Sequence, residues 1–141
     1  MRSFESGDPE SPLAAIEDAI SAIGRGEIVV VVDDEDRENE GDLIMAAEYA
    51  TPETIAFFVR YTSGVLCAPL IGERLDELAL PLMVSVNTEP MRTAYTITVD
   101  AAEGTTTGIS AADRAKTLNL LASKTSEPHE FVRPGHVLPL R

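Results

Sequence analysis

The chain has 141 residues, with 24 acidic and 11 basic side chains and a formal net charge of −13. This length fits one domain that buries roughly two-thirds of its unfolded surface. The negative charge disfavours a nucleic-acid backbone or an anionic membrane as a partner. The single cysteine, Cys67, excludes an internal disulfide framework. Without a basic and apolar leader or an apolar run of about 18 residues, the sequence predicts a cytoplasmic protein.

The chain is predicted to begin with a flexible tail at residues 1–10. Ser11 and Pro12 are typical of the first positions of a helix, which is then expected to end at Gly24. Residues 28–32 are a continuous run of β-branched apolar residues without polar alternation. This pattern is typical of a strand that is covered on both faces, so a central strand of an α/β sheet is expected here.

Four further elements are expected before residue 80. Residues 43–47 predict a second strand, and a Thr-Pro-Glu start predicts a helix over 51–62. A short apolar strand is predicted over 65–70, with a short amphipathic helix over 73–78. Cys67 lies in this apolar strand, so a buried, inert thiol is the default interpretation. A polar neighbour would be needed to make it reactive.

The C-terminal part also alternates between predicted strands and helices. Residues 93–99 predict a strand with one more polar side, and Ser110 begins a helix that extends to residue 121. Residues 133–135 predict a turn between two short extended pieces. Together these patterns predict an α/β protein, with residues 11–141 forming a three-layer α/β/α domain around a mixed, twisted sheet.

An acidic segment at residues 33–42 contains seven carboxylates. Carboxylates this dense repel one another unless a cation lies among them, and Mg²⁺ or Mn²⁺ prefers such oxygen ligands. The calcium-binding EF-hand pattern fails, because its twelfth position would be Ala47, where a glutamate is required. A sparser magnesium site remains open. The alternative is a solvated run of charges at the edge of a sheet.

Two other features could carry chemistry. The loop over 104–110 offers hydroxyl groups and a following helix N-terminus, which favour an anion such as phosphate, but an ordinary turn with Ser110 as a cap is equally compatible. His136 could act as a general acid or base because histidine titrates near neutrality. A lone histidine near a chain end is more often structural, so both interpretations stay open.

Four segments in the same order resemble one family, the 3,4-dihydroxy-2-butanone 4-phosphate synthases. The resemblance extends from about Leu13 to the last residue. It is carried by the acidic segment at 33–42, Arg-Tyr-Thr-Ser-Gly at 60–64, Thr-Thr-Gly-Ile-Ser-Ala-Ala-Asp-Arg at 106–114 and Arg-Pro-Gly-His-Val at 133–137.

The resemblance implies a lyase that converts ribulose 5-phosphate into 3,4-dihydroxy-2-butanone 4-phosphate and formate, in riboflavin biosynthesis, through a magnesium-stabilised enediolate. It also implies a three-layer α/β domain and a homodimer with active sites at the subunit interface. Glu38 would be the metal ligand. Substrate contacts would come from Arg37, Glu38, Asp42, Thr107 and Ser110, and the catalytic residues would be Asp33, Glu40, Cys67 and His136.

The family pattern continues past the position of Arg141 with a Gly-His-Thr-Glu motif and a further glutamate, so the C-terminal part of the domain is expected to be missing from this chain. Two alternatives follow from this expectation. The chain could be a non-catalytic homologue that acts as a structural or regulatory subunit. It could also be a generic acidic metal-binding module whose metal affinity is indifferent to sugar phosphates.

Overall fold

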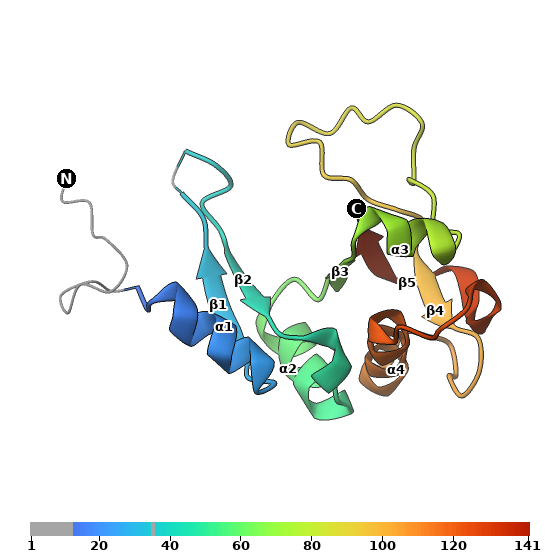
Figure 1. Cartoon of the computed structure of the whole chain (residues 1–141), viewed down its shortest axis with the longest axis horizontal. Coiled ribbons are helices and arrows are strands. Elements are labelled where there is room, and N and C mark those ends of the chain that lie inside the picture. Colours follow the sequence, from blue (N-terminus) through green and yellow to red (C-terminus); the bar gives the residue numbers. More distant parts are fainter. Residues whose placement is uncertain (1–12, 35) are drawn as a thin grey trace. The chain divides into compact units, whose positions relative to one another are not determined.

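The computed structural model describes residues 13–34 and 36–141, which belong to two compact units divided after Ala46. The first unit contains helix α1 (Ile16–Gly24) and strands β1 (Val29–Val32) and β2 (Gly41–Ile44). The second, Ala47–Arg141, contains the remaining elements (Figure 1). Among the described residues, no helix combines the length and apolar character needed to cross a membrane.

Helix α1 begins later than its sequence signals predict. Its first residue is Ile16, and the preceding Ala15 provides no side-chain cap. Residues 13–15 lie before the helix, so the prediction that they are helical is wrong, while Ser11, Pro12 and the predicted tail lie outside the described residues. The predicted end is confirmed, because the helix stops at Gly24 and Gly26 adopts a φ of 79°, which glycine adopts without steric cost.

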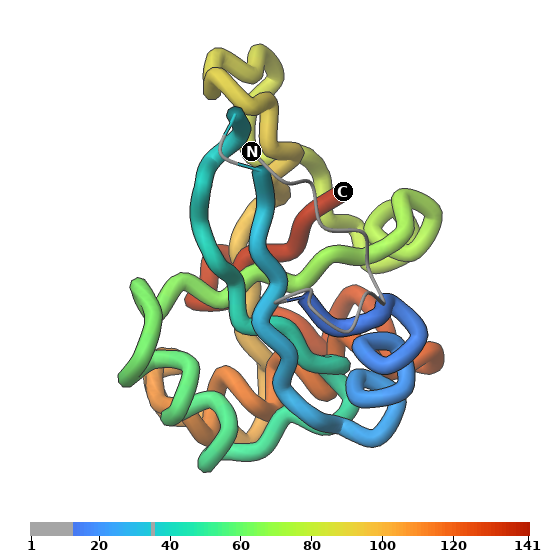
Figure 2. Tube along the Cα trace, turned by 90° about the vertical axis from the view of Figure 1, so that its left-hand side faces the viewer, coloured from blue at the N-terminus to red at the C-terminus, as the bar shows by residue number. Residues whose placement is uncertain are grey.

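Strands β1 and β2 form an antiparallel hairpin around the acidic segment, with Val29 opposite Ile44 and Val32 opposite Gly41 (Figure 2). The prediction of a central strand is wrong, since in the described part of the chain β1 pairs with β2 alone. The second strand lies at Gly41–Ile44 and not at 43–47. A β-branched run favours extended backbone but does not determine how many strands flank it.

Three helices of the second unit match their sequence signals. Helix α2 (Pro52–Tyr61) starts with a capping box in which Thr51 and Thr54 satisfy each other's backbone N–H groups. Helix α3 spans Gly72–Glu77, and helix α4 (Ala111–Ala122) is capped by the hydroxyl of Ser110. Two short 3₁₀ helices, η1 (Ala47–Tyr49) and η2 (Pro128–Glu130), complete the helical elements.

A mixed three-stranded sheet has the order β3 (Cys67–Pro69), β5 (Phe131–Leu140), β4 (Val99–Ala101). Strand β5 runs parallel to β3 and antiparallel to β4, which confirms the predicted mixed α/β character. The predicted turn at 133–135 is wrong, because β5 continues through it. The predicted strand 93–99 is reduced to β4 and two isolated bridges at Tyr95 and Thr96.

Helix α4 is the centre of the second unit's packing. One side of it contacts β4 and β5, and it also packs against α2 and η1 (Figure 1). Asn119 ties it to η1 by donating to the carbonyls of Ala47 and Ala50, at 3.1 and 2.9 Å. The buried apolar side chains around it include Ile55, Phe58, Val99, Ala101, Ala115, Leu118, Leu121, Phe131 and Val137.

Strands β4 and β5 are in close backbone contact at Gly135. The register of the pair shifts between Val99 and Asp100, and the N–H of Gly135 donates to the hydroxyl of Thr98 at 3.0 Å. A Cβ atom at this position would overlap the carbonyl group of Val99 and the amide nitrogen of Asp100. Glycine is therefore required here for strand pairing.

We expect Gly135→Ala to lower the free energy of unfolding by about 2–3 kcal/mol, because the added methyl group meets backbone atoms that cannot rotate away. Urea denaturation followed by circular dichroism measures the loss. Gly72→Ala is the control, since its methyl group would meet only the end of the flexible Arg141 side chain. Equal midpoints for the two variants would contradict the expected clash.

Candidate active site

The tip of the β1–β2 hairpin is organised by Asp33. Its carboxylate accepts hydrogen bonds from the backbone N–H groups of Glu40 and Glu38, both at 2.9 Å. These bonds, with a smaller contribution from Arg37 at 3.5 Å, hold the pKa of Asp33 below its ordinary value. Asp33 therefore fixes the backbone of the acidic segment.

The other predicted site residues of the hairpin, Arg37, Glu38, Glu40 and Asp42, are exposed. Within residues 13–34 and 36–141, no three His, Cys, Asp or Glu side chains are grouped so that they could hold a metal ion. This donor set does not fit a metal enclosed by protein ligands. It does fit a sparse magnesium site, in which one carboxylate shares the ion with water and substrate oxygens.

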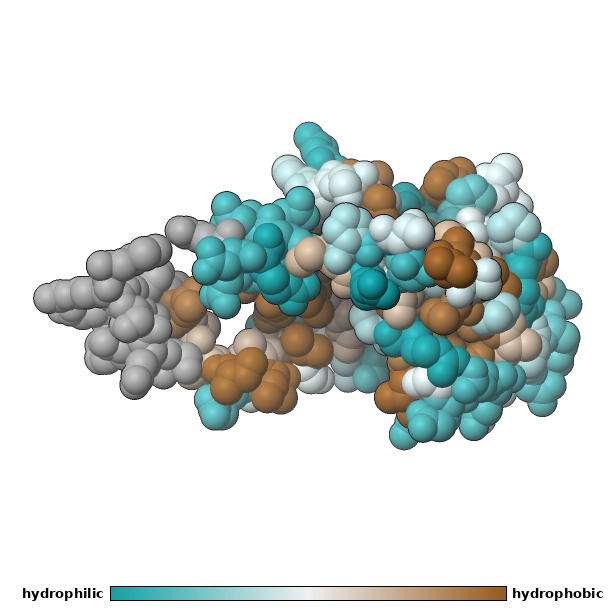
Figure 3. Space-filling model, turned by 90° about the horizontal axis from the view of Figure 1, so that it is seen from above, coloured by the Kyte–Doolittle hydropathy of each residue, from teal (hydrophilic) through white to brown (hydrophobic). Residues whose placement is uncertain are grey.

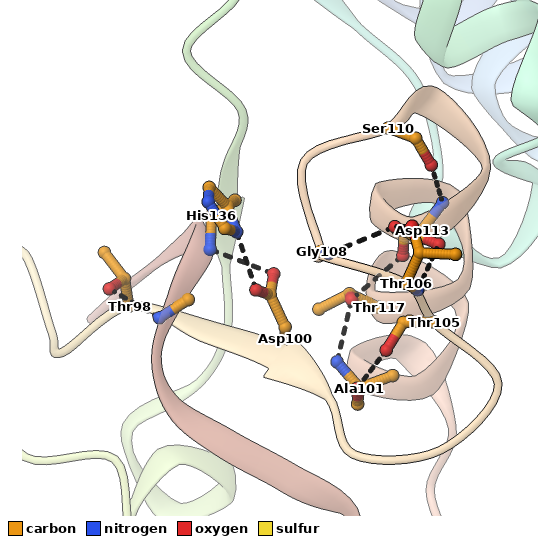
Figure 4. A network of polar contacts seen from close by, with 11 residues as sticks. Thr98, Asp100, Ala101, Thr105, Thr106, Gly108, Ser110, Asp113, Thr117 and His136 are labelled. Atoms are coloured by element: carbon orange, nitrogen blue, oxygen red, sulfur yellow. Dashed lines mark hydrogen bonds and ion pairs between the residues drawn. The ribbon is translucent and has the colours of Figure 1, made fainter.

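In the second unit, His136 on β5 is held by Asp100 on β4 (Figure 4). The Asp100 carboxylate accepts the backbone N–H of His136 at 2.9 Å through Oδ1. Its Oδ2 lies 2.7 Å from Nδ1 of the imidazole ring. The Asp100 side chain is 6% exposed, whereas that of His136 is 39% exposed. A buried carboxylate thus orients a histidine that remains open to solvent.

The loop over 104–110 is organised by Asp113, in the first turn of α4. Its carboxylate accepts from the Thr106 hydroxyl at 2.8 Å and from the backbone N–H groups of Thr106 and Gly108 at 3.2 and 3.0 Å. Led by the Thr106 hydroxyl, these bonds lower the pKa of Asp113 against the opposing effect of burial. Two of the loop's N–H groups are therefore already used and are not available to an external anion.

Ser110 and Thr107 differ in their local roles. The Ser110 hydroxyl accepts the N–H of Asp113 at 3.0 Å, so it serves as the helix cap that the turn interpretation predicts. Thr107 is exposed. Their predicted contacts with substrate stay predictions.

Gly108 connects the loop to the histidine. Its φ is 90°, and a Cβ atom there would overlap the Asp100 carboxylate and lie 2.8 Å from Nδ1 of His136. The glycine backbone therefore lies directly against the Asp100–His136 pair. Asp113 accepts the backbone N–H of Gly108 and so fixes the position of this glycine beside His136 (Figure 4).

Cys67 lies on β3, next to the strand that carries His136. The residue is exposed, so its interpretation as a buried thiol is wrong. Cys67 is aligned with Leu138 in the parallel pair, and His136 is two residues before Leu138 on β5. Because side chains alternate along a strand, Cys67 and His136 share one face of the sheet.

Sequence reasoning missed Asp100 as a site residue. It directly follows a predicted strand and stands between Val99 and Ala101, all three of which are buried. A carboxylate in such a position needs hydrogen-bond partners, which was the available signal. The identity of its partner depends on the register of β4 against β5.

Known proteins are similar to this chain over most of its length. Residues 17–141 match the sequence model of a family described as 3,4-dihydroxy-2-butanone 4-phosphate synthase. A protein of that name from Agrobacterium fabrum is 60% identical over 129 residues, covering 92% of this chain and 61% of that protein. The riboflavin biosynthesis protein RibBA of Rhodococcus erythropolis is 62% identical over 127 residues, covering 90% of this chain and 30% of that protein.

A solved structure of a 3,4-dihydroxy-2-butanone 4-phosphate synthase in complex with two magnesium ions superimposes with a TM-score of 0.90 at 55% identity. The matched region covers 92% of this chain and 60% of the chain in that structure. The fold and site define an α/β protein with a carboxylate-held histidine on an open sheet face. The chain belongs to the 3,4-dihydroxy-2-butanone 4-phosphate synthase family. It spans about three-fifths of the length of the synthases it matches.

The hydrogen bonds of Asp113 generate a prediction about acid stability. Because its folded-state pKa lies below the unfolded value of about 3.9, its contribution is complete above that pH and is lost as the pH falls further. We expect Asp113→Asn to lower the urea midpoint at pH 7, and the gap from wild type to narrow below about pH 4. Glu103→Gln, at an exposed carboxylate, is the control. A gap that is constant from pH 7 to 3 would contradict the assignment.

Proposed function

We propose that this chain acts as a 3,4-dihydroxy-2-butanone 4-phosphate synthase, which converts ribulose 5-phosphate into 3,4-dihydroxy-2-butanone 4-phosphate and formate. Family membership supports the reaction. The observation that carries it is His136, partly exposed and held by the buried Asp100 carboxylate. A rearrangement that begins with proton removal beside a carbonyl group needs such a positioned acid–base residue.

Glu38 is the proposed metal ligand, with Mg²⁺ or Mn²⁺ as the ion. Its backbone N–H is fixed by Asp33, while its carboxylate is exposed at the hairpin tip. When bound, the ion would supply Lewis-acid polarisation of neighbouring sugar oxygens. Arg37 and Asp42 would bind substrate oxygens in the same segment, and Thr107 and Ser110 are proposed as further substrate contacts.

His136 would transfer protons at the migrating and departing carbon centres. Cys67 shares the face of the sheet that carries His136 and is proposed to line the same pocket. The backbone N–H groups of Glu40 and Glu38 both donate to the Asp33 carboxylate, so the two residues are held close together in the hairpin. Glu40 is proposed as a second base. The proposed compartment is the reducing cytosol, where an exposed Cys67 would stay a thiol.

We further propose that two copies associate, with active sites at their interface. The second unit exposes several large apolar side chains, namely Val65, Ile71, Leu82, Met83, Val84 and Val86. Figure 3 shows such apolar residues, in brown, among polar ones on the face seen from above. Exposed apolar surface of this kind is typical of protein–protein contacts.

The dimer is tested by sedimentation equilibrium of the full 141-residue chain. We expect a mass near twice 15.1 kDa. Val86→Asp, which places a charge at a side chain that is 73% exposed, should shift the equilibrium toward the monomer. Val30→Asp, at an exposed strand residue of the first unit, is the matched control. A wild-type protein that stays monomeric at high concentration would exclude the association.

The activity is tested with ribulose 5-phosphate and Mg²⁺, by measuring formate. Because a sparse site completes its coordination with substrate oxygens, we expect Mg²⁺ to bind at least about fivefold tighter when the sugar phosphate is present, as measured by calorimetry. Glu38→Gln should abolish this tightening and lower formate production by about 100-fold or more. Asp36→Asn makes the same change of charge in the same segment and should leave both nearly unchanged.

The outcomes separate the alternatives. Magnesium binding that tightens with the sugar phosphate, but with no formate produced, would identify a non-catalytic homologue that keeps the substrate site. Magnesium binding that ignores the sugar phosphate would identify a generic acidic metal-binding module and overturn the proposed function.

A further inference from the structure

We propose that Asp100 is a positioning residue that fixes His136 in one tautomer, with the proton on Nδ1 and the lone pair on Nε2. The inference deepens the proposed function, since it names the atom of His136 that would accept a proton. It concerns the protein itself and can be tested whether or not the chain turns over substrate.

The tautomer follows from the hydrogen-bond inventory of a carboxylate. An ionised carboxylate can only accept, so a ring nitrogen 2.7 Å from its Oδ2 must be the donor. In a neutral imidazole that carries its proton on Nδ1, the other nitrogen holds a lone pair. Nε2 is therefore the available proton acceptor.

The surroundings hold this arrangement rigidly. The same carboxylate binds the backbone N–H of His136, so the ring cannot shift along the strand without breaking a second bond. Gly108 lies against the carboxylate, and Gly135 brings β5 onto the backbone of β4 beside it. The side chain of Asp100 is 6% exposed, which leaves water little room to replace either bond.

Asp100→Asn should invert the tautomer of His136 while keeping the shape of the side chain at position 100. The backbone N–H of His136 can only donate, so it selects the amide oxygen for its own partner. The amide NH₂ group then occupies the place of Oδ2 and faces Nδ1. A donor at that place requires a lone pair on Nδ1, so the proton must move to Nε2. Asp100→Asn therefore removes the proton acceptor without removing the histidine.

Long-range ¹H–¹⁵N NMR of the full chain distinguishes the two tautomers directly. The chain has two histidines, and His129→Gln assigns the signals. At a pH where the rings are neutral, we expect His136 to carry its proton on Nδ1 in the wild-type protein and on Nε2 in Asp100→Asn. Glu127→Gln is the matched control, because Glu127 contacts His129 at 3.3 Å on the exposed surface and should leave the signals of His136 unchanged.

Kinetics provide the second readout. If the chain is active, Asp100→Asn should lower kcat for formate production by at least about 100-fold with little change in KM, because the substrate contacts are intact and the proton acceptor is lost. A wild-type His136 protonated on Nε2, or an Asp100→Asn protein with an unchanged tautomer, would overturn the proposal. If Asp100→Asn does not fold, the wild-type spectrum alone decides. A chain that shows the expected tautomers but makes no formate refutes the proposed function and not this inference.

Discussion

The hydrogen bonds between Asp100 and His136 are the constraint on which the second unit's site depends. A buried carboxylate is costly unless its oxygens are satisfied, and here both are satisfied by one residue, through its backbone and its ring. That geometry requires the shift in register beside Asp100 and the close approach at Gly135. The pairing of β4 with β5 and the orientation of the histidine are therefore one structural feature.

Asp33 in the first unit and Asp113 in the second each fix the backbone of a loop. Each carboxylate accepts two backbone N–H groups of a neighbouring loop. These bonds lower the pKa of Asp33, and the Thr106 hydroxyl together with the two backbone donors lowers the pKa of Asp113. An acidic side chain in a loop thus has two possible uses, as an anchor for backbone or as a ligand for a cation. In the hairpin, Asp33 is the anchor, and the exposed carboxylate of Glu38 is left for its proposed role as metal ligand.

Local signals predicted helices α2 to α4 and the end of α1, because caps and apolar spacing act over a few residues. The Thr51 and Ser110 caps, and Gly24 and Gly26 at the end of α1, are examples. Strand partners were not predictable in this way. Residues 29–32 were correctly expected to be extended, but the return of the chain at Gly41 decides that they form a hairpin. Asp100 was missed for the same reason, since its partner lies 36 residues away.

At the proposed metal site, carboxylates are crowded together and exposed to solvent. Seven carboxylates in ten residues repel one another. Water and salt limit that repulsion at the exposed members, which are Asp34, Asp36, Glu38, Glu40 and Asp42. Exposure also weakens any single carboxylate as a ligand, so a magnesium ion would depend on substrate oxygens to complete its shell. By thermodynamic linkage the ion then favours substrate by the same factor as substrate favours the ion. Anchoring Glu38 through Asp33 reduces the conformational entropy lost when both bind, so the anchor contributes to this coupling without touching the metal.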